Sequence, residues 1–387
     1  MRRIVFFTLF VSLALAGQAQ ESNEASDFLK KGIQAEELGL ETRAMEYYTE
    51  AQQADPSLAA PWYRIGLLYE HKSHYGQAIE AFRNAIQRCD TLAEAYEHLV
   101  YNYILDNDYN GARNGGLSDS NELVRLTERA IELNPQSASA CASMALLMSH
   151  QGRHTNALSW AHRAIQLDAK DPRAYNALGV VNYHKGNDAD AISAFKKALN
   201  ADPNNTDAYY NLGVMFTQRG NHETAIGYLK KGLQKDNKSI RLHYYLGVAY
   251  RQRGDSVRAI QCFETILKMD SGFTPAYNQL GAICCDKGDY NKAIAYHGHA
   301  SRINPRDAES YKCLGKVYAD KGDYPKALRN YQKAVQVNDS DHETYLLIAR
   351  LYALQGNAAR EASSYKKAAK LGNKEAQAWM TQRGKPW

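Results

Sequence analysis

Apolar and polar positions follow the spacing of amphipathic helices along most of the chain, and one phrase returns at nearly constant intervals. It reads YNALG at 175–179, YNLGV at 210–214, YYLGV at 244–248, YNQLG at 277–281 and YKCLG at 311–315. In YNALG, YNQLG and YKCLG the Tyr stands three positions before the Leu, and together with the residue four further on these positions lie on one helical face. The pattern therefore predicts a series of helices that each bury one stripe.

A second phrase follows each of these helices and keeps a period of 34 residues. It reads KGNDADAI at 185–192, RGNHETAI at 219–226, RGDSVRAI at 253–260, KGDYNKAI at 287–294 and KGDYPKAL at 321–328. Gly is typical of the left-handed position that closes a helix, and Asp or Asn is typical of the cap that opens the next one. The phrase therefore predicts a tight turn between two helices.

Glycine also occupies the middle of the first predicted helix in each of these units. The positions are Gly179, Gly213, Gly247, Gly281 and Gly315. A glycine inside a helix costs about 1 kcal/mol relative to alanine. Its return in every unit predicts that a neighbouring helix approaches closely at this point.

These motifs closely resemble the tetratricopeptide repeat family, whose unit is a helix-turn-helix of 34 residues. The second unit carries the signature most completely, with Trp62, Ile65, Gly66, Tyr69, Ala78, Phe82 and Ala85. The resemblance implies the all-α class and a right-handed superhelix of stacked helix pairs. It predicts ten repeats over residues 25–375, starting at 25, 59, 93, 138, 172, 206, 240, 274, 308 and 342. Residues 20–24 are expected to form a short polar lead-in and residues 376–387 a capping helix.

The third unit is longer than the others and contains an insertion near 113–121. Within it, DNDYNG at 106–111 matches the first half of a calcium loop, but Leu117 stands where that loop needs a bidentate Glu. The favoured interpretation is the ordinary inter-helix turn at 107–112, with Asn107 in place of Gly. Asp119 and Glu122 then offer a capping box for the next helix.

The first residues have the composition of a secretory leader. Arg2 and Arg3 precede an apolar run from Ile4 to Ala16, followed by small-residue cleavage patterns. We expect residues 1–19 to be a signal peptide, and no transmembrane span in the mature chain. The expected location is the periplasm or envelope of a Gram-negative bacterium, or the secreted fraction.

Charge and motif content argue against several functions. The formal net charge is only +5, so electrostatics gives no reason to expect binding of nucleic acid. No P-loop, zinc-protease helix or nucleophile elbow occurs, so we expect no enzyme, no cofactor and no metal. His71, His150 and His184 share one position in different units, and a structural role is expected for them. The six cysteines allow no pairing to be assigned.

The resemblance implies that the first helix of each unit lines a concave groove, chiefly through positions 2, 5, 9, 12 and 13. Polar, aromatic and mostly basic residues at these positions are typical of a groove that binds extended peptide, although solvated surface is the alternative. The predicted partner-binding residues are Arg173, Asn176, Tyr183, Tyr210, Gln218, Arg241, Tyr244, Arg251, Gln252, Asn278, Lys312, Lys316 and Arg350.

The sequence thus favours a non-catalytic exported scaffold or adaptor that binds other proteins or extended peptide segments, in the assembly of an envelope complex. The alternative is a periplasmic chaperone or peptide-binding receptor for many clients. A scaffold predicts one or two stoichiometric partners, whereas a chaperone predicts many weak ones.

Overall fold

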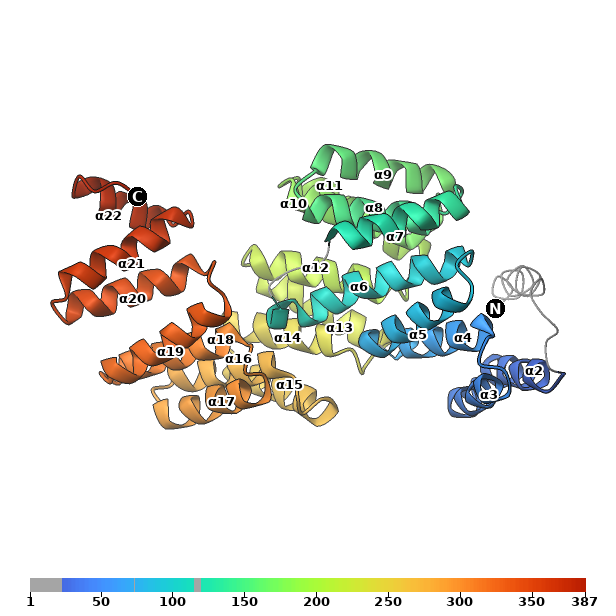
Figure 1. Ribbon diagram of the computed structural model, residues 1–387, viewed down its shortest axis with the longest axis horizontal. Helices are drawn as coiled ribbons and strands as arrows, with labels where there is room; N and C mark the ends of the chain where they lie inside the picture. The colour runs from blue at the N-terminus through green and yellow to red at the C-terminus, as the bar shows by residue number, and fades with distance from the viewer. Residues whose placement is uncertain (1–22, 73, 115–119) are drawn as a thin grey trace. The chain divides into compact units, whose positions relative to one another are not determined.

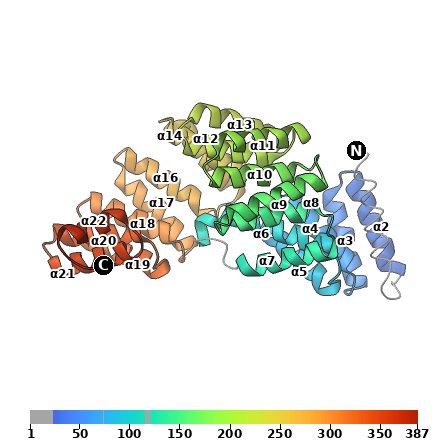
Figure 2. The same ribbon diagram turned by 90° about the horizontal axis from the view of Figure 1, so that it is seen from above.

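The computed structural model describes residues 23–72, 74–114 and 120–387, and the regular structure within these ranges is entirely helical. Successive helices form antiparallel pairs, as Figures 1 and 2 show from two sides. The expected all-α superhelical class is confirmed. The chain divides into two compact units, one of residues 1–109 and 119–208 and the other of residues 110–118 and 209–387.

Among the described residues, eleven helices belong wholly or partly to the amino-terminal unit. Two of them, α6 and α12, also contribute residues to the other unit. The eleven helices are α2 (Asn23–Glu37), α3 (Glu41–Ala54), α4 (Ala59–His71), α5 (Tyr75–Arg88), α6 (Ala93–Asn114), α7 (Ser120–Leu133), α8 (Ala138–His150), α9 (His154–Leu167), α10 (Pro172–His184), α11 (Asp188–Ala201) and α12 (Thr206–Gln218).

The other helices all belong to the carboxy-terminal unit. They are α13 (His222–Lys235), α14 (Ile240–Gln252), α15 (Ser256–Met269), α16 (Thr274–Asp286), α17 (Tyr290–Ile303), α18 (Ala308–Asp320), α19 (Tyr324–Val337), α20 (His342–Leu354), α21 (Ala358–Lys370) and α22 (Lys374–Gln382). Even-numbered helices are the first members of the pairs.

The repeated KGDY turns have the predicted geometry. Gly288 and Gly322 have φ values of 75° and 77°, which L-residues with a side chain rarely adopt. The next residue caps the following helix: Asp289 Oδ1 accepts from the Lys292 backbone N at 3.2 Å, and Asp323 Oδ1 from that of Lys326 at 3.1 Å. The interpretation of this phrase as a turn between two helices is confirmed.

The mid-helix glycines lie where a large side chain of the second helix crosses the first. A Cβ at Gly179 would lie 2.4 Å from Cε1 of Phe195, and one at Gly315 would lie 2.4 Å from the ring of Tyr331. Both rings are almost completely buried. The predicted close approach is confirmed, because only glycine leaves room for the ring.

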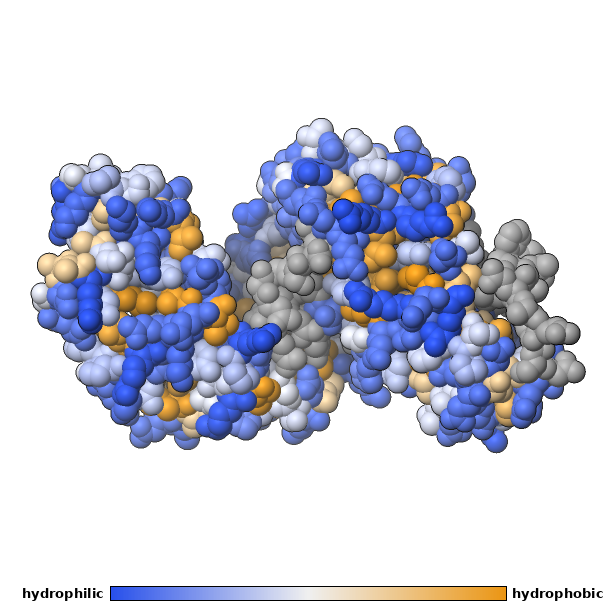
Figure 3. All heavy atoms as spheres, in the orientation of Figure 1, coloured by the Kyte–Doolittle hydropathy of each residue, from blue (hydrophilic) through white to orange (hydrophobic). Residues whose placement is uncertain are grey.

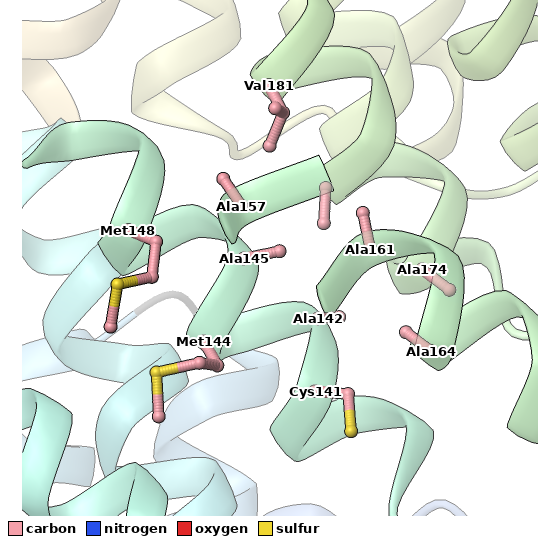
Figure 4. Packing of buried hydrophobic residues seen from close by; sticks show 11 residues of the cluster. Cys141, Ala142, Met144, Ala145, Met148, Ala157, Ala161, Ala164, Ala174 and Val181 are labelled. Carbon is pink, nitrogen blue, oxygen red and sulfur yellow. The ribbon is translucent and has the colours of Figure 1, made fainter. Parts of the chain in front are cut away.

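Small residues allow the same closeness elsewhere in the amino-terminal unit. Ala142 and Ala145 of α8, Ala157 and Ala161 of α9, and Ala174 of α10 belong to one buried cluster (Figure 4). Alanine side chains bring helix backbones near each other without leaving a void. Part of the core of this unit therefore consists of small side chains packed between α8, α9 and α10.

On the face that Figure 3 shows, hydrophobic residues form narrow strips, one of them over α19 and α20. Partly buried Leu328 and Leu347 pack there against a core that includes Tyr331 and Ile348. The strip is thus the edge of the core between these two helices.

The insertion in the third unit differs from the sequence prediction. α6 continues without interruption through residues 106–112 to Asn114. The turn predicted at 107–112 is therefore wrong, and these residues do not form the calcium loop considered as its alternative. Asn107 stands at the position where a left-handed glycine follows most of the other first helices, and α6 continues through it. The predicted cap at Asp119 lies outside the described residues.

The predicted signal peptide, residues 1–19, also lies outside the described residues. In the ranges that the structure covers, no helix is both long and apolar enough to cross a membrane.

Candidate functional site

First helices of consecutive pairs contact each other, as α8 does α10, and as α16 does both α14 and α18. Their side chains therefore form a continuous surface within each unit, which we call the first-helix face. All the partner-binding residues predicted from the sequence lie on first helices. The structure distinguishes those that are buried in the stack from those that solvent reaches.

Tyr210 and Arg241 are buried against each other. The guanidinium carbon of Arg241 lies 4.7 Å from the centroid of the Tyr210 ring, and the Tyr245 ring meets Tyr210 edge-on at 5.3 Å. Tyr210 is 7% exposed and Arg241 is 8% exposed. A cation over an aromatic face is stabilising when both groups are desolvated. These residues hold α12 to α14.

Two of the predicted asparagines are buried as well. Asn176 donates its Nδ2 to Oδ1 of Asn205 at 2.8 Å. Asn278 donates to Oδ2 of Asp307 at 3.1 Å, while its own Oδ1 accepts from Oγ of Ser310 at 3.1 Å and lies 3.0 Å from Nδ1 of His297. Both polar groups of Asn278 are paired, and a buried network that is satisfied in this way fixes the register of neighbouring elements.

Tyr244 and Arg251 meet through a residue of the next first helix. Gln279 of α16 donates to the Tyr244 hydroxyl at 3.2 Å and accepts from Nη1 of Arg251 at 3.1 Å. Arg251 also reaches Oδ2 of Asp286 with Nη2 at 3.0 Å. Burial raises the pKa of Tyr244 to about 12, so its hydroxyl stays protonated. This chain of contacts joins α14 to α16.

The remaining predicted cations each have a carboxylate beside them. Lys312 lies 2.7 Å from Glu309, 3.7 Å from Asp341 and 3.3 Å from Glu343. Burial disfavours its ammonium, but the three carboxylates outweigh burial and hold the pKa of Lys312 above its usual range. Lys316 pairs with Glu343 at 3.4 Å, and Arg350 pairs with Glu375 at 2.8 Å. The face of the carboxy-terminal unit is therefore charge-compensated, although its sequence looked mostly basic.

Lys312→Glu is expected to lower the free energy of unfolding by about 1–3 kcal/mol, because it places a fourth carboxylate among three that are themselves partly exposed. Lys312→Met should cost less, since it adds no negative charge. Urea unfolding of both variants, at pH 7 and near pH 4, tests this. The gap between them should shrink at the lower pH as the carboxyls become protonated. Equal stability of the two variants at pH 7 would contradict the prediction.

Other predicted residues remain accessible to solvent. Gln218 and Gln252 are exposed, and Tyr183 is partly exposed with its ring centroid 6.0 Å from that of His184. Arg173 is partly exposed, with Nε 3.5 Å from Oδ1 of Asp171. The structure therefore does not bring all the predicted residues into one site. It distributes them over the two units.

Histidines at equivalent positions lie closer together than the sequence suggested. The ring centroids of His150 and His184 are 5.5 Å apart, and those of His154 and His184 are 6.4 Å apart. Burial, followed by the two neighbouring imidazoles, lowers the pKa of His184. Ser149 Oγ lies 2.8 Å from its Nδ1. No group of three suitable ligands is arranged for a metal ion in the described part of the chain.

Acidic residues on the amino-terminal unit were missed. Glu70 of α4 and Glu94 and Glu97 of α6 occupy positions 12, 2 and 5 of their units, and Tyr101 occupies position 9. These are the same positions that were used to choose residues in later units. Applying the rule to the second and third units would have found them.

A hollow of about 470 Å³ lies on another side of this unit, between α5, α6 and α7. Arg83 and Glu122 at its rim are 3.3 Å apart. The residues that line it are Glu80, Arg83, Asn84, Ile86, Gln87, Leu99, Glu122 and Leu126.

The chain was compared with known structures and sequences. It resembles yeast Tom70 with a TM-score of 0.56 at 13% identity, over 92% of this chain and 94% of that one. For the human IFIT1 dimer with m7Gppp-AAAA the TM-score is 0.54 at 16% identity, over 92% and 91% of the two chains. For a tetratricopeptide repeat protein from Parabacteroides merdae it is 0.51 at 21%, over 62% and 95%. At these identities the likeness shows the fold. A search of curated proteins gave no match.

Family models cover much of the chain. Models described as tetratricopeptide repeat match residues 59–91, 151–206, 194–227 and 216–284. A further model, described as TPR repeat, matches residues 281–322 and 315–356. Repeats of this kind indicate protein partners, and with the fold they support a protein-interaction scaffold. The chain belongs to the tetratricopeptide repeat family.

Proposed function

We propose that this protein is an exported, non-catalytic scaffold that binds an extended segment of a partner protein on the first-helix face of its carboxy-terminal unit. Scaffolds of this family are generally non-catalytic. The observation that supports the site is that buried residues on this face hold the helices together while their neighbours are exposed to solvent. Buried Tyr210, Arg241 and Asn278 hold the helices in place, and Gln252, Lys316 and Arg350 meet solvent beside them.

The charge pairs on this face suggest the chemistry of the partner. Arg251, Lys316 and Arg350 each have a carboxylate neighbour, so a bound segment would find alternating charges in place of a positive surface. Such a surface suits peptide amides and mixed side chains better than a polyanion. The IFIT1 structure contains m7Gppp-AAAA. For the present chain we propose a protein partner and no nucleic acid.

The repeat boundaries and the location of the protein belong to the same proposal. Ten repeats over residues 25–375, with residues 376–387 as the cap, would form the binding scaffold. Export would follow from the basic and apolar leader at residues 1–19. Assembly of an envelope complex is the process in which a soluble scaffold of this kind would act.

Crosslinking in cells with the tagged chain tests the site. Gln252→Ala, Lys316→Ala and Arg350→Ala are combined, because these side chains are at least partly exposed. The triple variant is expected to capture at least about tenfold less partner than the unmodified chain, which corresponds to about 1.4 kcal/mol of binding free energy. Mass spectrometry identifies and quantifies the partner.

A matched control carries the same types of substitution on second helices: Arg329→Ala and Gln332→Ala on α19 and Lys366→Ala on α21, all of them exposed. It should capture the partner as the unmodified chain does. Equal capture by both triple variants would rule out the proposed face. A broad set of weakly captured proteins would instead favour the chaperone.

A further inference from the structure

Carboxylates from three helices and from the cap of a fourth gather on the first-helix face of the amino-terminal unit. Glu70 lies on α4, Glu94 and Glu97 lie on α6, Asp171 precedes α10 and Asp207 lies on α12. Arg173 interacts electrostatically with Asp171, Glu97 and Glu70, and Tyr101 of α6 donates to Asp207. Residues from α4, α6, α10 and α12 therefore surround one region of this face.

Positive charge in this region is scarce. Arg173 faces Asp171, Glu97 and Glu70 together, and His98 Nδ1 lies 2.8 Å from Glu70. Glu70 is partly buried, which disfavours its carboxylate, but His98 and a hydrogen bond from Asn102 hold its pKa below the usual range. Glu97 lacks such compensation: burial raises its pKa, and Ser137 and Arg173 offset only part of that effect. Among the described residues around Arg173, the three carboxylates of Asp171, Glu97 and Glu70 therefore face one guanidinium and the imidazole of His98.

Hydrogen-bond acceptors without donors occur beside these carboxylates. Asn102 is wholly buried and donates its Nδ2 to Glu70, while its Oδ1 has no hydrogen-bond partner. Asn176, 7% exposed and one turn after Arg173 on α10, also has an Oδ1 without a partner. A buried acceptor without a donor costs free energy of about 1–3 kcal/mol. An added N–H group would satisfy either atom, but because both are closed to solvent it would reach them only after the side chains around them move.

Carboxylates in excess and acceptors that lack donors require the same kind of ligand, a cation with several N–H groups. We propose that the first-helix face of the amino-terminal unit binds Lys or Arg side chains of a basic segment in a partner protein. Glu94 and Glu97 would receive the cation, because both are partly exposed and neither is needed to hold Glu70 in place. This inference rests on the proposed function, because both assign partner binding to a first-helix face. It concerns residues of the amino-terminal unit, whereas the proposed function concerns the carboxy-terminal unit.

Fluorescence anisotropy with a short labelled peptide of alternating Arg and Gly, and a matched peptide of Glu and Gly, tests this binding. The whole chain carries a formal charge of +5, so its net charge alone would favour the acidic peptide. The Arg peptide is expected to bind more tightly than the Glu peptide. Combined Glu94→Gln and Glu97→Gln should weaken its binding at least about tenfold.

The control is Glu128→Gln with Glu132→Gln on α7, which changes the net charge equally at exposed positions of the same unit. It should bind as the unmodified chain does. Equal losses in the two double variants, or no preference for the Arg peptide, would overturn the proposal. A photo-crosslinking Arg peptide on the unmodified chain should label α4, α6 or α10. Labelling confined to the carboxy-terminal unit would also overturn it, whatever the capture experiment on that unit shows.

Discussion

Phe195→Ala is expected to lower the free energy of unfolding by about 3–5 kcal/mol, as removal of a buried aromatic ring usually does. Phe195 is 1% exposed, and its ring occupies the space that the missing side chain of Gly179 leaves free. The substitution therefore removes the contact that joins α11 to α10. Urea unfolding followed by circular dichroism measures the change, and hydrogen exchange of α10 and α11 shows where the stack opens first.

A second substitution separates this contact from a general loss of apolar area. Gly179→Ala alone should destabilise the protein, because its Cβ would lie 2.4 Å from the ring. Added to Phe195→Ala, it should restore part of the lost stability, since the methyl group then enters vacant space and alanine favours the helix by about 1 kcal/mol. Additive losses in the double variant would show that glycine and ring are not coupled.

The repeat signature predicted those parts of the structure that depend on local backbone chemistry. Gly288 and Gly322 need a left-handed backbone, and Asp289 and Asp323 need a donor three residues ahead. Both requirements lie within a few residues of sequence. The prediction of a turn at 107–112 was wrong for a related reason. It depended on one residue, Asn107, acting in place of glycine, and the helix instead continues to Asn114.

The candidate site was less predictable because its interactions connect different repeats. Arg241 looked like a groove cation, but its partner is the ring of Tyr210, one repeat earlier. Lys312 looked available to a ligand, but Asp341, which caps α20, and Glu343 of the next repeat lie beside it. Position within the repeat indicates which way a side chain points. It does not show what the neighbouring repeat places beside it.

This distinction changes how the binding face should be tested. A variant that combines Tyr210→Ala with Lys312→Glu would remove packing between α12 and α14 and add repulsion between α18 and α20. Loss of a partner from such a variant would not separate binding from stability. Substitutions at Gln252, Lys316 and Arg350 avoid that ambiguity, because these side chains are at least partly exposed.

His297 places an ionisable side chain at a core position. It occupies the place in α17 that Phe195, Phe263 and Tyr331 occupy in other repeats, and it is 1% exposed. Its ring fills the space above Gly281, with Nε2 2.5 Å from where a Cβ would be. Nδ1 lies 3.0 Å from Oδ1 of Asn278. An ionisable ring thus takes the place of an apolar one.

Stability is expected to fall by about 3 kcal/mol between pH 6.5 and pH 4 because of this one residue. Burial, followed by the charge of Arg251, lowers the pKa of His297 from 6.5 to about 4. Between these values the unfolded chain binds a proton that the folded chain does not, so unfolding becomes more favourable as the pH falls. Below about pH 4 both states are protonated and the loss stops growing. Each pKa unit contributes about 1.4 kcal/mol.

His297→Phe isolates this contribution, because it keeps an aromatic ring at the position and removes the titrating group. Asn278 Oδ1 would still accept from Ser310 at 3.1 Å, so the substitution does not leave that atom without a donor. Urea unfolding from pH 7 to pH 4 should show a shallower loss of stability in the variant, while carboxyl groups titrate alike in both proteins. The difference should begin near pH 6.5, where the unfolded histidine starts to bind its proton. Parallel pH profiles would mean that His297 becomes protonated in the folded chain as readily as in the unfolded one, and that burial in this stack does not exclude the charge.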